Sequence, residues 1–126
     1  MIKGIGTDLI EIGRIEKACA AEAFLVRYFT DKERELIGGH PQKAAGNFAV
    51  KEAVSKVFGT GVRGFGLKDI EVLRDQRGKP YVNLYGEALK LSAALGIDRI
   101  HVSISNTGTL AIAYAVGCLL YTSRCV

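Results

Sequence analysis

The chain has 126 residues and combines 48% hydrophobic with 24% charged residues, which is typical of one globular domain and excludes a disordered polypeptide. A formal net charge of +4 favours an acidic or phosphate-bearing partner, whereas scattered basic residues and the absence of Trp argue against nucleic-acid binding. The three cysteines predict neither a disulfide framework nor a zinc site, and without a membrane span or a signal-peptide core we expect a cytoplasmic protein with no membrane partner.

The first half of the chain predicts one strand followed by three helices. Residues 2–12 are rich in isoleucine and carry glycines, a pattern that favours a strand approached closely by another element or a ligand. Residues 14–29 can place their apolar side chains on one side of a helix. Thr30 or Asp31 then caps a short helix that a glycine pair ends. The longest helix spans residues 41–59, because proline suits a first helical turn and glycine ends helices.

The second half predicts a hairpin, a helix and two further strands. The hairpin strands are residues 70–73 and 81–85, and the segment 75–79 supplies turn residues between them. The glycine-rich loop 59–66 follows a helix and precedes a strand, which is the wrong order for a dinucleotide-binding fingerprint. The remaining predicted elements are a helix over residues 87–95 and strands over residues 100–105 and 110–116.

This order of elements predicts an α+β fold in a single domain, with a mostly antiparallel sheet wrapped around one long helix. We assign residues 1–117 to this domain. Residues 118–126 have the sequence that a transposon end used in sequencing libraries would encode if it were read in frame. We therefore expect this segment to be a non-native tail.

Two carboxylates far apart in the sequence are the candidate catalytic centre. Asp8 lies in the first predicted strand and Glu52 in the longest predicted helix. If strand and helix pack together, both can bind Mg²⁺, which usually takes one or two protein carboxylates and completes its shell with substrate phosphates and water. Lys56, one helical turn after Glu52, can then neutralise phosphate oxygens. The alternative is that Asp8 is a strand-end residue and that Glu52 pairs with Lys56 on the helix surface.

Several segments, in this order and spacing, resemble the holo-[acyl-carrier-protein] synthases, the short 4′-phosphopantetheinyl transferases. The resemblance extends from Ile2 to about Val116. It rests on the segments Gly6-Thr7-Asp8-Leu9-Ile10-Glu11, Phe48-Ala49-Val50-Lys51-Glu52-Ala53, Phe58-Gly59-Thr60-Gly61, Gly78-Lys79-Pro80 and His101-Val102-Ser103-Ile104-Ser105.

The resemblance implies the phosphopantetheinyl transferase fold and an enzyme that transfers 4′-phosphopantetheine from coenzyme A to a serine of apo acyl carrier protein, in fatty acid biosynthesis. Adenosine 3′,5′-bisphosphate is the second product. The family uses Mg²⁺ and forms a homotrimer with coenzyme A between subunits. The metal ligands of the family fall on Asp8 and Glu52, and Lys56 would stabilise the leaving phosphate. Glu52 or a metal-bound water would accept the serine proton, and the sequence does not separate them.

The resemblance also implies contacts to both substrates. Arg14, Lys17 and Arg27 are the candidates for contacting the acidic carrier, whose approach the positive charge of the chain would steer. The positions that match coenzyme A contacts are Ser55, Lys56, Gly59, Pro80 and Asn106.

The chain departs from the family pattern at two positions. Asn47 stands where the family usually has Arg, and Asn106 stands where it usually has His. We expect each change to remove a contact to the polyanionic coenzyme A. The alternative function is therefore a catalytically weakened homologue that still binds the carrier protein or coenzyme A.

Overall fold

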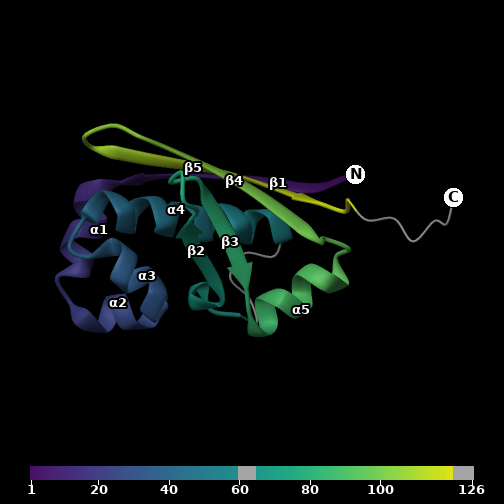
Figure 1. The fold of residues 1–126 in the computed structure, drawn as a ribbon, viewed down its shortest axis with the longest axis horizontal. Coiled ribbons are helices and arrows are strands. Elements are labelled where there is room, and N and C mark those ends of the chain that lie inside the picture. The colour runs from purple at the N-terminus through teal and green to yellow at the C-terminus, as the bar shows by residue number, and fades with distance from the viewer. Residues whose placement is uncertain (60–64, 121–126) are drawn as a thin grey trace, which may run out of the picture.

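The structure, a computed structural model, describes residues 1–59 and 65–120. A long helix lies beneath a three-stranded sheet, with a hairpin and the remaining helices on its other sides (Figure 1). In chain order the elements are β1 (Ile2–Glu11), α1 (Ile12–Cys19), α2 (Glu22–Tyr28), α3 (Asp31–Ile37), α4 (Pro41–Phe58), a 3-10 turn (Leu67–Asp69), β2 (Ile70–Arg74), β3 (Pro80–Leu84), α5 (Gly86–Ala94), β4 (Arg99–Asn106) and β5 (Leu110–Cys118).

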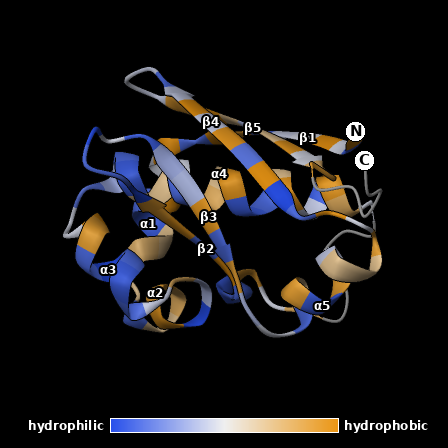
Figure 2. Cartoon of the chain, turned by 45° about the vertical axis from the view of Figure 1, so that its right-hand side comes forward, coloured by the Kyte–Doolittle hydropathy of each residue, from blue (hydrophilic) through white to orange (hydrophobic). Residues whose placement is uncertain are grey.

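Every strand pairing in the described part of the chain is antiparallel, which confirms the predicted α+β class. The strands form two sheets rather than one: β1, β5 and β4 make the first in that order, and β2 and β3 make the second. Edge strand β3 lies beside edge strand β4 without ladder pairing, so the two sheets together curve around α4 (Figure 1). Along β4 the hydropathy alternates from residue to residue, as expected for a strand with one face on the core (Figure 2).

Helix α4 is the centre of the core, and 12 of its 18 residues are buried. Strand β1 packs directly on it because glycines face the helix. A Cβ atom at Gly6 would overlap the Ala53 carbonyl oxygen, and one at Gly4 would lie 2.5 Å from the Val57 carbonyl oxygen. This confirms the expected close approach to the first strand. The backbone of β1 therefore fixes the position of Asp8 relative to α4.

The helix predicted over residues 14–29 is wrong in its continuity, because the chain forms two helices that break at Ala20 and Ala21. The break turns α2 so that its aromatic side chains face α4. The rings of Phe24 and Phe48 stack with their centroids 5.8 Å apart, and those of Phe24 and Tyr28 lie 4.8 Å apart. Burial of these large rings outweighs the continuity of one helix.

Local signals at two element ends are confirmed. The Thr30 hydroxyl accepts a hydrogen bond from the Glu33 amide at 3.2 Å, and the Glu33 carboxylate accepts one from the Thr30 amide at 3.1 Å, which completes a capping box on α3. In the β2–β3 turn, Asp75 Oδ1 accepts hydrogen bonds from the amides of Arg77 and Lys79 at 2.8 and 2.9 Å.

Strand β5 continues one residue beyond the predicted domain boundary, to Cys118, which lies opposite Ile2 of β1 and Arg99 of β4. The Leu119 amide then donates a hydrogen bond to the Met1 carbonyl at 2.9 Å. Residues 121–126 of the expected tail, and residues 60–64 of the glycine-rich loop, lie outside the described residues. None of the described helices is both long and apolar enough to cross a bilayer.

Candidate active site

The two candidate carboxylates come together where β1 lies on α4. Asp8 shares the inward face of β1 with Gly6 and Ile10, opposite Ala113 of β5, so it faces the helix that carries Glu52. Both side chains line one cavity of about 340 Å³. Apart from Arg14, the rest of its lining is apolar and includes Ile15 and Phe24. The cavity thus combines two carboxylates with apolar surface.

The electrostatics of the pair show that the two carboxylates act on each other. Burial raises the pKa of Glu52, the Asp8 carboxylate raises it further, and the Lys56 ammonium opposes both effects. The Asp8 side chain keeps 20% of its surface exposed. Two half-buried carboxylates that repel each other form a site that favours a cation.

Lys56 lies at the edge of this site. Its Nζ donates hydrogen bonds to the Thr7 carbonyl at 2.8 Å and to Asp8 Oδ1 at 3.4 Å, while 55% of the side chain stays exposed. Within the described residues its ion pair is with Asp8 of β1, not with Glu52 on its own helix. An exposed, flexible ammonium in this position can turn toward a phosphate group in the cavity.

The donor set fits a hard divalent cation. Asp8 and Glu52 provide oxygen ligands, and the described residues contain no group of three His, Cys, Asp or Glu side chains arranged to hold a metal. A cation bound here would therefore need further oxygens from substrate phosphates and water, which is how Mg²⁺ is usually held.

Two other predicted contacts lie on the C-terminal half of α4. Ser55 is 2% exposed, and its hydroxyl donates to the Lys51 carbonyl at 2.9 Å within the same helix. Gly59 is exposed and ends α4 with a φ of 76°, a conformation that glycine adopts without strain. Gly59 is therefore accessible to a ligand, whereas the Ser55 side chain is turned away from solvent.

The remaining predicted coenzyme A contacts meet in a second cavity. Pro80 at the start of β3 and Asn106 at the end of β4 line a space of about 260 Å³, together with Lys43, Gly46 and Arg74. This cavity shares no lining residue with the carboxylate cavity. The structure therefore divides the predicted site residues into two groups within one chain.

The predicted carrier-contact residues lie near the first cavity. Arg14 lines it from the first turn of α1, and Lys17 follows in the last turn of the same helix. Arg27 is exposed on α2, with its guanidinium 5.3 Å from the centre of the Tyr28 ring. All three are solvent-exposed cations on neighbouring helices.

The Asn47 side chain faces the interior of the protein and not solvent. Asn47 is fully buried, and its Nδ2 donates to Glu33 Oε2 at 3.0 Å and to the Val72 carbonyl at 2.9 Å. The sequence analysis also missed Lys51, whose buried Nζ lies 2.7 Å from Glu33 Oε1. The sequence contained a signal for this buried polar face of α4. Its three polar residues are spaced four apart, at Asn47, Lys51 and Ser55, and therefore lie on one side of the helix.

Comparison with known proteins shows the family of this chain. The family model of the 4′-phosphopantetheinyl transferase superfamily matches residues 4–115. The chain belongs to this superfamily. A holo-[acyl-carrier-protein] synthase of Lachnoclostridium phytofermentans is 56% identical over 117 residues, which cover 93% of this chain and 96% of that protein. The residues matched by the family model include Asp8, Glu52 and Pro80.

Solved structures of phosphopantetheinyl transferases share the fold. The Bacillus anthracis holo-(acyl-carrier-protein) synthase in complex with CoA (3′,5′-ADP) superposes with a TM-score of 0.77 at 38% identity, covering 93% of this chain and 96% of that one. The Helicobacter pylori holo-[acyl-carrier-protein] synthase in complex with coenzyme A gives a TM-score of 0.81 at 30% identity, covering 90% and 99%. The α+β architecture is therefore that of the superfamily.

Proposed function

We propose that this phosphopantetheinyl transferase is a holo-[acyl-carrier-protein] synthase, which transfers 4′-phosphopantetheine from coenzyme A to a serine of apo acyl carrier protein. The observation that supports this most is the pairing of Asp8 and Glu52 beside Lys56, at the positions of the family motifs. The relatives named as holo-[acyl-carrier-protein] synthases and the relatives solved with coenzyme A support the same substrates.

In this mechanism Asp8, Glu52 and Lys56 have separate roles. Asp8 and Glu52 would hold Mg²⁺, which when bound withdraws charge from the phosphorus under attack. Lys56 turns from Thr7 and Asp8 toward the leaving phosphate and neutralises its developing charge. Glu52 or a water molecule in the cavity accepts the proton of the carrier serine as its oxygen attacks phosphorus. Adenosine 3′,5′-bisphosphate then leaves.

Intact-mass measurement of the carrier tests this function. We expect incubation with coenzyme A, Mg²⁺ and apo acyl carrier protein to add one phosphopantetheine to the carrier, and chelation of the metal to prevent it. The matched control is a carrier whose acceptor serine is replaced by alanine, which should gain no mass. Coenzyme A binding without any mass gain would instead support the alternative, a catalytically weakened homologue. The reason for this alternative is Asn106, which lines the second cavity where the family usually has His.

Arg14, Lys17 and Arg27 provide the surface that we propose for the acidic carrier. Arg14 lines the catalytic cavity and the other two lie on the adjoining exposed surface, so a carrier bound there would present its serine to Glu52. In the same assay, charge reversal by Arg14→Glu should raise KM for the carrier on the order of tenfold while leaving KM for coenzyme A unchanged. An equal change in both constants would contradict this role.

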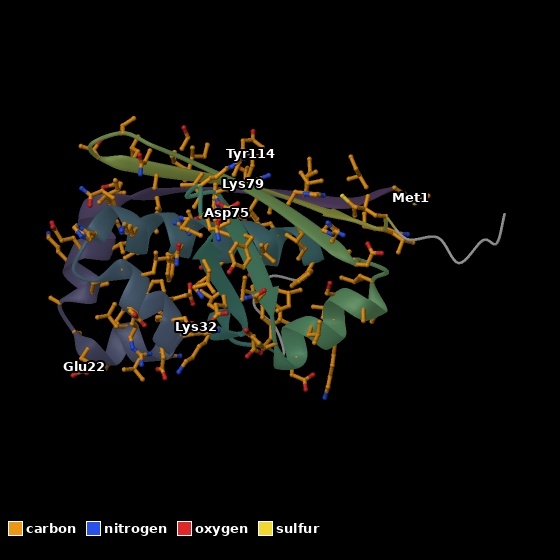
Figure 3. The ribbon with its side chains drawn as sticks, in the orientation of Figure 1. Met1, Glu22, Lys32, Asp75, Lys79 and Tyr114 are labelled. Atoms are coloured by element: carbon orange, nitrogen blue, oxygen red, sulfur yellow. The ribbon has the colours of Figure 1, made fainter. Side chains whose placement is uncertain are left out.

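The outer face of the three-stranded sheet supports the proposed homotrimer. Ile5 and Leu9 of β1 are 66% and 61% exposed, and Tyr114 of β5 is 55% exposed. They share the face opposite α4, and Tyr114 points away from the helices (Figure 3). A row of large exposed apolar side chains of this kind is typical of a subunit interface.

Sedimentation equilibrium tests the assembly. We expect the native protein to sediment with the mass of three chains, and Leu9→Lys to sediment as a monomer because it places a charge in the apolar contact. Leu89→Lys is the matched control, since Leu89 is 52% exposed but lies on α5, away from this sheet face. A monomeric native protein at micromolar concentration would refute the trimer.

We place this activity in the cytoplasm. Cys19 and Cys118 are both free thiols, as is usual in that reducing compartment. Export of the tagged native protein from the cell would contradict this location.

A further inference from the structure

The second cavity has the charge of an anion site. Within the described residues its lining contains two cations, Lys43 of α4 and Arg74 of β2, and no carboxylate. Asn106, which also lines it, adds an amide that can donate hydrogen bonds. The nearby Asp75 carboxylate already accepts two backbone hydrogen bonds in the β2–β3 turn. Nothing described in this cavity neutralises its two positive charges.

Arg74 is the more informative of the two cations, because it is half-buried. Among the described residues its guanidinium donates one hydrogen bond, from Nη1 to the Leu73 carbonyl at 3.3 Å, and forms no ion pair. Burial lowers the pKa of Arg74, with the Glu33 carboxylate opposing. A guanidinium has five N–H donors and keeps its charge in proteins, so most of its donors remain available to a ligand.

The interior carboxylate of Glu33 does not accept hydrogen bonds from Arg74. Glu33 Oε1 accepts from Lys51 Nζ and the Thr30 amide, and Oε2 accepts from Asn47 Nδ2 and the Val72 amide. Each Glu33 oxygen therefore already accepts two hydrogen bonds, and none of the four comes from Arg74. Glu33 acts on Arg74 only through longer-range attraction.

Gly46 lies beside the guanidinium in this cavity. A Cβ atom at this position would lie 3.8 Å from an Arg74 terminal nitrogen and 3.3 Å from Ile104 Cγ2. With glycine there, Ile104 and the Arg74 guanidinium pack close against α4. The cavity thus combines room, positive charge and unused donors.

The position of this cavity on α4 shows how it relates to the catalytic centre. At 100° per residue, Lys43 and Glu52 lie about 180° apart around the helix axis. Lys43 and Glu52 therefore line the two cavities from opposite sides of α4. This agrees with a site between two copies in the proposed trimer.

We propose that Arg74, assisted by Lys43, binds the ribose 3′-phosphate of coenzyme A and thereby selects coenzyme A over 3′-dephospho-coenzyme A. The assignment rests on the proposed transferase function and names a specificity residue for it. A phosphate monoester dianion matches the planar donors of a guanidinium. Arg74 would supply the charge that the buried Asn47 and the neutral Asn106 do not provide.

Calorimetric binding of two nucleotides tests this directly. Adenosine 3′,5′-bisphosphate and adenosine 5′-monophosphate differ only in the 3′-phosphate. We expect Arg74→Gln to weaken binding of the bisphosphate on the order of 10- to 100-fold, the range of one lost charged hydrogen bond, and to change monophosphate binding less than about threefold. Lys43→Gln, at an exposed position, should act in the same direction with a smaller effect.

Arg77→Gln is the matched control, because Arg77 is exposed in the same turn but does not line the cavity. In turnover assays Arg74→Gln should raise KM for coenzyme A without raising that for 3′-dephospho-coenzyme A. Equal losses for both nucleotides, or no loss for either, would overturn the proposal even if transfer is observed. A retained, Arg74-dependent preference for the bisphosphate in a protein that transfers nothing would support the site and reject the transferase function.

Discussion

Asp8→Ala and Glu52→Ala are each expected to reduce phosphopantetheine transfer by about 10³-fold or more, equivalent to about 4 kcal/mol of transition-state stabilisation. Each substitution removes one of the two protein carboxylates proposed to hold the metal. Asp8→Ala also removes the carboxylate that holds Lys56 beside the cavity. The measurement is initial rate by intact carrier mass at saturating coenzyme A, with Glu35→Ala, an exposed residue of α3, as the control.

These variants should stay folded, which separates loss of chemistry from loss of structure. Because the pKa of Glu52 is raised in the folded protein, its ionisation at neutral pH costs folding free energy. Glu52→Gln should therefore unfold at the same or a higher temperature than the native protein at pH 7. Mg²⁺ should raise the unfolding temperature of the native protein but not that of Asp8→Ala. Full activity in both alanine variants would refute the site assignment.

Lys51→Met is expected to lower the free energy of unfolding by about 3–5 kcal/mol, because it leaves the Glu33 carboxylate buried without its cation. Lys51 and Glu33 are both fully buried, and burial alone lowers the pKa of the lysine and raises that of the glutamate. Lys51 Nζ also donates to the carbonyls of Leu67 and Ile70, which would lose their donor. Urea unfolding at one fixed protein concentration gives the difference, since assembly also contributes to stability.

Two further variants make this test specific. Lys43→Met removes an exposed lysine of the same helix and should change the stability by less than about 1 kcal/mol. Glu33→Gln combined with Lys51→Met should recover part of the loss, because the uncompensated charge is then gone. If Lys51→Met proves as stable as Lys43→Met, the buried pair does not hold α3 and α4 against β2.

Much of the fold follows from local sequence signals. Thr30 and Glu33 form their capping box, Pro41 begins α4, and the segment 75–79 turns between β2 and β3, because these features depend on neighbours in the chain. The candidate metal pair was also accessible, since the segments around Asp8 and Glu52 resemble the superfamily motifs. The glycines in β1 predicted a close approach by another element or a ligand, and the structure shows that this element is α4.

Other features depended on contacts that no local pattern contains. The break at Ala20 and Ala21 exists because Phe24 packs on Phe48, which is 24 positions further along the chain. Helix α4 is buried on most sides, so its sequence lacks the clear polar face that would have separated an inward Lys51 from an outward Lys56.

The sequence by itself determined the class of fold, most of the order of its elements and the two carboxylates that we propose for the catalytic centre. The tertiary structure decided which polar side chains face the interior. It directs Asn47 and Lys51 to Glu33, leaves Arg74 beside an open cavity, and separates that cavity from Asp8 and Glu52. The physical reason is that burial and charge compensation are properties of the whole packed chain, whereas capping, turns and periodicity are properties of a few consecutive residues.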